Sequence, residues 1–283
     1  MDKVLAFFRM IKIEHTIFAL PFAFTGAIIA AKGLPSLDKI FWIAVAMFGA
    51  RTGAMGFNRV ADAEIDAKNP RTANREIPAG KIKKWEAILY IIIAFLIYEI
   101  ATYKLNPLCF KLSPIPIVIF ILYSYTKRFT FLCHIVLGVA LGLAPMGAWV
   151  AITGNIDYRI IWLGVGVMFW VAGFDLIYAI QDIEFDREHN LFSIPRFLGV
   201  EKTIYLARFF HIIAFILFLW AKYLFDLGLV YLFGVVICGI FMIYEHKLIK
   251  PHDLSKLNMA FFNLNAYISL TIFVFTFLDI VVI

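Results

Sequence analysis

Residues 38–66 of this chain, DKIFWIAVAMFGARTGAMGFNRVADAEID, begin as an apolar segment and end in a run of carboxylates. A helix needs about 20 mostly apolar residues to cross the hydrocarbon core of a bilayer, and the first part of this stretch supplies them. An irregular segment in lipid would leave its backbone polar groups without hydrogen bonds. The stretch therefore predicts a membrane-spanning helix that carries acidic side chains to one membrane face.

The composition extends this prediction to the whole chain. Of its 283 residues, 63% are hydrophobic and 16% are charged, and the mean hydropathy is +0.86. Water-soluble globular domains are far less apolar, so they are excluded. We expect an all-α integral membrane protein with about nine transmembrane helices, near residues 15–32, 38–59, 86–104, 107–124, 131–152, 158–181, 203–223, 226–245 and 257–281.

We expect these helices to form one transmembrane domain over residues 1–283. Two polar segments interrupt the apolar pattern, one from Arg59 to Trp85 and one from Asp182 to Lys202. Each begins with acidic residues where an apolar span ends. The chain therefore divides into two motif-bearing halves, about 1–130 and 131–283, which suggests a weak internal repeat.

The Lys and Arg residues predict the orientation in the membrane. Most of the 26 basic residues lie in loops on the side of the N-terminus, and both polar segments are on that side. Cytoplasmic loops of multi-pass proteins carry such an excess of positive charge. We therefore expect a plasma (inner) membrane protein with the N-terminus and both polar segments in the cytoplasm and the C-terminus outside. This topology also explains the net charge of +6, and no nucleic-acid-binding motif accompanies it.

The first acidic run has a spacing with chemical consequences. Asn58, Asp62 and Asp66 are four residues apart, so on a helix they lie along one face. Carboxylates at this spacing repel each other, and near a membrane they need a cationic partner. Acids at a helix end are also commonly just solvated. A single cluster would leave both interpretations open.

A second run repeats the pattern. Tyr178, Asp182 and Asp186 have the same spacing at the corresponding end of a later span. Mg²⁺ prefers hard oxygen ligands and typically takes one or two carboxylates together with phosphate oxygens. The two clusters therefore predict that Mg²⁺ ions hold a diphosphate between them. The three Cys and six His residues show no spacing typical of a disulfide framework or a zinc site.

Basic residues near both runs complete a phosphate site. Lys127 and Arg128 end the fourth expected span, and Arg71 and Arg75 lie in the first polar segment. Lys and Arg bind phosphate oxygens through charge-assisted hydrogen bonds. Lys127 and Arg128 also fit the positive-inside pattern, so both interpretations stay open for them.

Two charged residues lie inside the expected spans. Arg51 precedes Asn58 by about two helical turns, and Asp175 precedes Asp182 by the same number. A charge inside a membrane needs a partner. The partner of Arg51 is either a carboxylate of the first run or the carboxylate of an aromatic substrate deeper in the bundle. Asp175 either binds substrate or pairs with a basic residue.

Over nearly its whole length, the sequence resembles the UbiA superfamily of intramembrane aromatic prenyltransferases. The family pattern Asn-x3-Asp-x3-Asp is met at residues 58–66, its continuation Arg-Thr-Ala-x-Arg at residues 71–75, and the second Asp-x3-Asp at residues 182–186. The resemblance is in particular to the branch that prenylates 4-hydroxybenzoate. It is carried by residues 123–129, 136–138, 144–146 and 173–175.

The resemblance implies a helix bundle around a central cavity that opens to lipid and is capped by the two polar loops. It implies Mg²⁺-dependent transfer of a polyprenyl group from polyprenyl diphosphate to the ring of an aromatic carboxylic acid, namely 4-hydroxybenzoate in ubiquinone biosynthesis. The implied metal ligands are Asn58, Asp62, Asp66, Asp182 and Asp186, and the four aspartates with Lys127 are the implied catalytic residues. The implied substrate-binding residues are Arg51, Arg71, Arg75, Arg128, Tyr125, Tyr178 and Asp175, with the two Tyr rings shielding a prenyl cation.

Two alternatives stay open. The run from Arg187 to Pro195 departs from better-known members and resembles a subgroup associated with menaquinone biosynthesis, so a dihydroxynaphthoate is the alternative acceptor. A cation-coupled transporter is the alternative of another class, because Arg51 and Asp175 are intramembrane charges. A transporter would carry polar residues near the membrane midplane, whereas the acids here cluster at one face.

Overall fold

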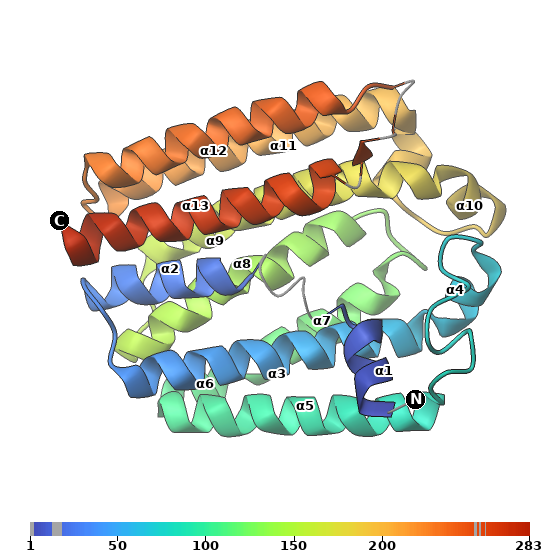
Figure 1. Ribbon diagram of the computed structural model, residues 1–283, viewed down its shortest axis with the longest axis horizontal. Coiled ribbons are helices and arrows are strands. Elements are labelled where there is room, and N and C mark those ends of the chain that lie inside the picture. The colour runs from blue at the N-terminus through green and yellow to red at the C-terminus, as the bar shows by residue number, and fades with distance from the viewer. Residues whose placement is uncertain (1–2, 13–18, 252–253, 255, 258) are drawn as a thin grey trace.

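The computed structural model describes residues 3–12, 19–251, 254, 256–257 and 259–283. Within these ranges helices build the fold, and the long ones run side by side along one direction (Figure 1). Eight helices among the described residues are long and apolar enough to cross a membrane, and α2 (Leu20–Ala31) is a further, shorter apolar helix. The prediction of an all-α integral membrane fold is therefore confirmed, with nine as an approximate helix count.

The bounds follow the predicted spans closely for most helices. After α2, the long elements in chain order are α3 (Leu37–Ala61), α5 (Lys84–Leu105), α6 (Pro107–Leu112) with α7 (Pro114–Thr126), α8 (Cys133–Thr153), α9 (Tyr158–Ala179), α11 (Ile194–Leu224), α12 (Leu229–Leu248) and α13 (Asn265–Phe277). Short π-helical segments, Met259–Leu264 and Leu278–Val282, flank α13. Of the first predicted span, residues 15–18 lie outside the described residues.

Two predicted spans differ in detail from the structure. The span predicted over 107–124 is divided at Ser113 between α6 and α7, because Pro114 has no N–H to continue the hydrogen-bond ladder. The span predicted over 203–223 begins earlier, at Ile194, where the Ser193 side chain accepts a hydrogen bond from the N–H of Arg196. A kink at Gly199, whose φ is +73°, separates this first turn from the rest of α11.

A short N-terminal helix, α1 (Lys3–Met10), was not among the predicted elements. It lies across the long helices (Figure 1). Its buried residues Phe7 and Met10, with the following Ile11, pack in one apolar cluster with Ile82 and Ile91. Eight residues are too few to cross a bilayer, so the hydropathy pattern could not separate α1 from the flanking polar sequence.

Small residues allow the long helices to approach closely. A Cβ at Gly26 of α2 would lie 2.3 Å from the carbonyl oxygen of Pro145 in α8, and a Cβ at Gly142 would lie 2.5 Å from the carbonyl oxygen of Gly164. Such contacts replace the hydrophobic effect as a packing force inside lipid. They hold α8 against both α2 and α9, at the centre of the bundle.

The two polar segments meet at one end of the bundle. Two six-residue helices, α4 (Ala63–Lys68) and α10 (Ile183–Glu188), lie close together there (Figure 1). The C-terminus lies toward the opposite end (Figure 1). The predicted acidic runs are therefore brought to a common end of the helix bundle, which is where the candidate site is found.

Candidate active site between the two halves

The two acidic runs share one local backbone design. Asp62 follows α3 with φ −91° and ψ 0°, and Asp182 precedes α10 with φ −102° and ψ 4°. This sparsely populated region of the backbone map is a common location for active-site residues. In each half the next Asp is four residues later, inside the short helix that follows. The i to i+4 hydrogen bonds from the N–H of Asp62 to Asn58 (2.9 Å) and from that of Asp66 to Asp62 (2.8 Å) preserve the predicted stacking.

Asp62 is buried and paired with a cation from α7. The Nζ of Lys127 lies 3.0 Å from Oδ2 of Asp62, and the amide of Asn58 donates to the same oxygen at 3.2 Å. The other carboxylate oxygen, Oδ1, is buried without a hydrogen-bond partner among the described residues. Arg128 lies 3.8 Å from it and donates instead to the carbonyl oxygen of Ala61 at 2.5 Å.

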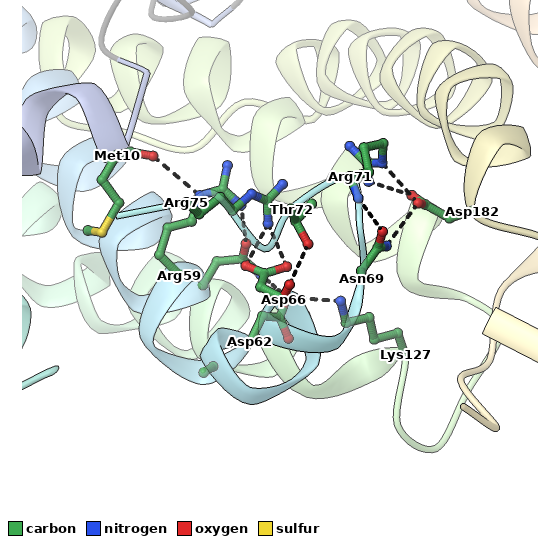
Figure 2. A network of polar contacts seen from close by, with 12 residues as sticks. Met10, Arg59, Asp62, Asp66, Asn69, Arg71, Thr72, Arg75, Lys127 and Asp182 are labelled. Atoms are coloured by element: carbon green, nitrogen blue, oxygen red, sulfur yellow. Dashed lines mark hydrogen bonds and ion pairs between the residues drawn. The ribbon is translucent and has the colours of Figure 1, made fainter. Parts of the chain in front are cut away.

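Asp66 is held by its own loop. Nη1 of Arg75 donates to both carboxylate oxygens at 2.7 Å (Figure 2). The hydroxyl of Thr72 donates to the backbone carbonyl of Asp66 at 3.1 Å, which folds the loop back over α4. The first polar segment therefore closes on the first acidic run and brings its arginines to the carboxylates.

Asp182 is bound from the other half of the chain. Arg71 donates from Nε to Oδ1 at 3.0 Å and from Nη2 to Oδ2 at 2.6 Å, and Asn69 donates to Oδ1 at 3.3 Å (Figure 2). Arg71 also donates to the hydroxyl of Tyr178 at 3.3 Å. Burial alone would lower the pKa of Arg71, but the hydrogen bonds and charge of Asp182 outweigh it and raise that pKa. The guanidinium therefore stays cationic.

Asp186 is fixed by the second polar segment. The hydroxyl of Ser193 donates to its Oδ2 at 2.6 Å, and the N–H of Leu191 donates to its carbonyl oxygen at 2.9 Å. The N–H of Phe192 donates to the carbonyl oxygen of Lys127 at 2.7 Å. This loop consequently connects the second acidic run to the residue that pairs with Asp62.

A cavity of about 650 Å³ extends from these charges into the bundle. Its volume is in the range typical of small-molecule sites. All four aspartates line it, and so do Lys127, Arg71 and Arg75. Away from the charges its wall is apolar, formed in part by Met47, Leu105, Leu112, Phe120, Leu141 and Ile160. The cavity thus combines a polar end for an anionic head group with an apolar body for a hydrocarbon chain.

Several predicted substrate-binding residues contact other parts of the chain. Arg51 lines the cavity, but its guanidinium donates to the backbone carbonyls of Ile11 (3.3 Å) and Lys12 (2.9 Å), just beyond α1. Tyr125 and Arg128 are not among the residues that line the cavity, and they stack on each other, with the Arg128 guanidinium 4.9 Å from the Tyr125 ring centre. The neighbouring Tyr123 lines the cavity instead.

Asp175 pairs with a basic residue, which is one of the two alternatives inferred from the sequence. Its Oδ2 lies 2.7 Å from Nδ1 of His134, the second residue of α8. Both residues line the cavity. Sequence spacing did not single out His134, because its partner is 41 residues away on another helix.

The structure adds further residues to the site. Arg59, the first residue of the first polar segment, is buried in the last turn of α3 and donates to the carbonyl oxygen of Met10 (3.3 Å). Asn69 and Ser193 each donate to an aspartate of the second run. The sequence could have pointed to these two residues, because each lies in the loop directly after an acidic run.

The donor set fits the predicted Mg²⁺ chemistry. Asp62, Asp66 and Asp186 are buried carboxylates, and the buried Oδ1 of Asp62 has no hydrogen-bond partner among the described residues. Within that part of the chain no three His, Cys, Asp or Glu side chains form a closed metal cage. Because Mg²⁺ is usually bound by one or two carboxylates plus phosphate oxygens and water, an open arrangement suits it.

Solved structures of other proteins share this architecture. The apo structure of a UbiA homolog from Aeropyrum pernix K1 superposes with a TM-score of 0.86 at 33% identity and covers 94% of this chain and 98% of its own. The structure of a UbiA homolog from Archaeoglobus fulgidus bound to GPP and Mg²⁺ has a TM-score of 0.65, 18% identity, and coverage of 94% and 99%. At 18% identity, the similarity to the Archaeoglobus fulgidus structure concerns the fold alone.

Curated sequences point the same way. The 4-hydroxybenzoate octaprenyltransferase of Shewanella woodyi is 28% identical over 278 residues, or 96% of either chain. The enzyme of that name from Shewanella oneidensis is 30% identical over 247 residues, covering 87% of this chain and 86% of its own. Residues 19–267, which contain both acidic runs, match the family model described as the UbiA prenyltransferase family. The chain therefore belongs to the UbiA prenyltransferase family.

Proposed function

We propose that this protein transfers a polyprenyl group from polyprenyl diphosphate to the ring of 4-hydroxybenzoate, with Mg²⁺ as cofactor, in quinone biosynthesis of the ubiquinone type. The observation that carries the proposal is the cavity with one charged and one apolar end. An amphiphile with an anionic head and a long hydrocarbon chain matches both ends. Membership in a prenyltransferase family supports this choice of donor.

The basic residues have complementary roles in the proposed reaction. Lys127, Arg71 and Arg75 each neutralise an aspartate at the polar end. On arrival of the diphosphate they can donate to its oxygens, since Lys and Arg carry several donors each. As the carbon–oxygen bond breaks, negative charge grows on the leaving diphosphate, and fixed cations stabilise that charge.

Mg²⁺ would be held by Asp62 and Asp66, with Asn58, in one half and by Asp182 and Asp186 in the other. When bound, it supplies positive charge at the leaving diphosphate. Asn58 supports this arrangement because it already donates to Asp62. Tyr178, which accepts from Arg71 beside Asp182, can present its ring to the allylic cation.

The 4-hydroxybenzoate acceptor is proposed from the names of the curated relatives. Arg51 remains the proposed partner of its carboxylate, because it lines the cavity about two helical turns from Asn58. To bind the acceptor it would exchange one of its backbone acceptors for a carboxylate. Arg51→Leu should then raise the KM of the acceptor at least tenfold and leave that of the donor unchanged, and equal KM values in variant and wild type would disprove this role.

A dihydroxynaphthoate carboxylic acid is the second candidate acceptor. The run from Arg187 to Pro195, which departs from better-known members, contacts the site directly through Ser193 and Phe192. A change at Ser193 can therefore alter the cavity near Asp186. Both candidate acceptors can be offered to the same purified enzyme.

Ion-coupled transport is disfavoured. The intramembrane acid Asp175 is paired with His134, and the other site carboxylates gather at one end of the bundle. Family membership also favours prenyl transfer. For the orientation, we propose that this charged end faces the cytoplasm, in accord with the distribution of Lys and Arg.

The test is an assay of the purified full-length protein in detergent or nanodiscs. Octaprenyl diphosphate and Mg²⁺ are combined with a panel of aromatic acids that includes 4-hydroxybenzoate and a dihydroxynaphthoate carboxylic acid, and products are identified by mass. We expect a prenylated hydroxybenzoate and release of diphosphate, both abolished by EDTA and restored by excess Mg²⁺. Product from the naphthoate alone would replace the proposed acceptor, and no product from any acceptor would overturn the proposed function.

A further inference from the structure

One pair of cavity residues has no role in binding the diphosphate as described above. His134 and Asp175 face each other between α8 and α9, with Nδ1 of His134 2.7 Å from Oδ2 of Asp175. His134 is only 3% exposed. Its second ring nitrogen, Nε2, is buried and has no hydrogen-bond partner among the described residues.

The pair belongs to the same cavity as the charged residues that would hold the donor. Both side chains line the cavity. Asp175 lies in α9 about two helical turns before Asp182, which follows that helix, and His134 is the second residue of α8. Lys127, Arg71 and Arg75 pair with aspartates at that end, which leaves His134 available for a different task.

The hydrogen bond to Asp175 determines which ring nitrogen can act. A carboxylate accepts from an N–H, so it stabilises the tautomer with the proton on Nδ1 and leaves the lone pair on Nε2. A buried polar atom without a partner is costly and rare in native structures. An acceptor that donates a hydroxyl hydrogen bond to Nε2 would remove that cost. The same carboxylate would stabilise the imidazolium after proton transfer.

We propose that His134, oriented by Asp175, is the catalytic base that takes the proton from the ring hydroxyl of the aromatic acceptor. This inference rests on the proposed function. It assigns to the enzyme the group that makes the acceptor ring nucleophilic, a task distinct from binding the diphosphate.

The proposed step balances without a further reactant. The hydroxyl O–H bond breaks, its proton moves to Nε2, and the electron pair left on oxygen raises the electron density of the ortho ring carbon. That carbon bonds to C1 of the prenyl group as the C1–O bond breaks and its electrons leave with the diphosphate. The ring carbon then loses its own proton to the diphosphate, and the imidazolium returns its proton to the ring oxygen. His134 therefore ends in the same protonation state in which it accepted the proton.

Other ionisable groups surround the pair. Cys133 is adjacent to His134 in the chain, Tyr123 of α7 interacts electrostatically with Asp175, and Asp186 of α10 interacts electrostatically with His134. A simple pH profile would mix their ionisations with that of His134. The test therefore varies the acidity of the acceptor.

The experiment compares wild type with His134→Gln in the full-length enzyme with Mg²⁺ and octaprenyl diphosphate. Glutamine can still donate to Asp175 but cannot take a proton. With 4-hydroxybenzoate, kcat should fall about 100-fold, the usual scale of general base catalysis, while the KM of the donor stays within about twofold. With 3-fluoro-4-hydroxybenzoate, whose hydroxyl is more acidic and which keeps one free ortho carbon, the ratio of wild-type to variant kcat should shrink to about tenfold or less.

Two further variants make the result decisive. His189→Gln changes a histidine that contacts the Phe185 carbonyl at the end of α10 and does not line the cavity, so it should keep wild-type kcat with both acceptors. Asp175→Asn should lower kcat with 4-hydroxybenzoate, and this loss should likewise be smaller with the fluorinated acceptor. This variant serves as the test if His134→Gln does not fold.

The outcomes separate this inference from the proposed function. A variant kcat within about twofold of wild type, or an equal loss with both acceptors, would overturn the role of His134 while leaving prenyl transfer intact. Wild type that prenylates no aromatic acceptor would overturn the proposed function itself. A loss of kcat that is smaller with the more acidic acceptor supports the role of His134 as a base, because a purely structural contact would affect both acceptors alike.

Discussion

Arg71 and Asp182, 111 residues apart in the chain, form a two-point ion pair that joins the loop after the first acidic run to the second run. Its N–O distances are 3.0 Å and 2.6 Å. The planar fork of a guanidinium matches the two oxygens of a carboxylate, which is the geometry seen here. The site is therefore assembled from both halves of the chain.

Arg71→Lys should weaken donor binding although it keeps the charge. A lysine cannot make the two parallel hydrogen bonds, so the loop of residues 69–75 should lose its position over Asp182. We expect the KM of the prenyl diphosphate to rise by about 10-fold or more, since one charge-assisted hydrogen bond contributes about 1.5–3 kcal/mol. Steady-state kinetics with varied donor measure this change.

The matched control is Arg187→Lys, because Arg187 is half-exposed and contacts Glu184 on the surface of α10. It should leave the KM unchanged, as surface ion pairs contribute little. Similar kinetics for the two variants would contradict the role given to the two-point geometry.

Lys127→Gln should lower turnover more than binding. It removes the cation beside the buried carboxylate of Asp62, where the distance is 3.0 Å, and removes a fixed positive charge at the leaving group. We expect kcat to fall about 10²- to 10³-fold at saturating donor and Mg²⁺, the usual effect of deleting one preorganised electrostatic contact.

Lys84→Gln is a suitable comparison, because both Lys84 and its partner Glu64 are exposed. Its kcat should match that of wild type. If Lys127→Gln also retained wild-type kcat, Lys127 would be only a membrane-flanking charge of the positive-inside pattern.

Arg59→Gln should loosen α1 from the bundle. The buried guanidinium donates to the carbonyl oxygen of Met10 at the end of that helix, and loss of a charged donor to a buried acceptor costs about 1–3 kcal/mol. Hydrogen–deuterium exchange over residues 3–12 should accelerate, while exchange in α8 and α9 should not change. Lys3→Gln, which breaks only an ion pair to Glu86, should exchange like wild type. Unaltered exchange in Arg59→Gln would refute this contact.

Gly26→Ala should destabilise the packing of α2 on α8. The added Cβ would lie 2.3 Å from the Pro145 carbonyl oxygen, and backbone atoms cannot move aside as a flexible side chain can. Overpacking of this kind costs about 1–3 kcal/mol, so the thermal midpoint in detergent should fall. Gly147→Ala, where an added Cβ has no neighbour within 4 Å, should not lower it. Equal midpoints for both variants would contradict the close approach.

Local features of the sequence were sufficient for much of the fold and for the outline of the site. Apolar segments such as 131–152 correspond closely to α8 (Cys133–Thr153), because the need to satisfy backbone hydrogen bonds in lipid leaves only the helix. The spacing of Asp62 and Asp66 likewise indicated carboxylates on one face. The short helix α1 was missed, because eight residues carry too weak a periodic signal, whereas α4 and α10 were anticipated only through the helical spacing of the acidic runs and not as separate elements.

The sequence by itself determined that the chain is a bundle of membrane helices with two acidic runs at one end, because hydropathy and residue spacing are local properties. Only the tertiary structure decided which charges meet. Asp182 receives Arg71 from the other half, Asp175 receives His134 across two helices, and Arg51 contacts the backbone beyond α1. These contacts join residues 39 to 111 positions apart, and no periodicity encodes how helices pack against each other.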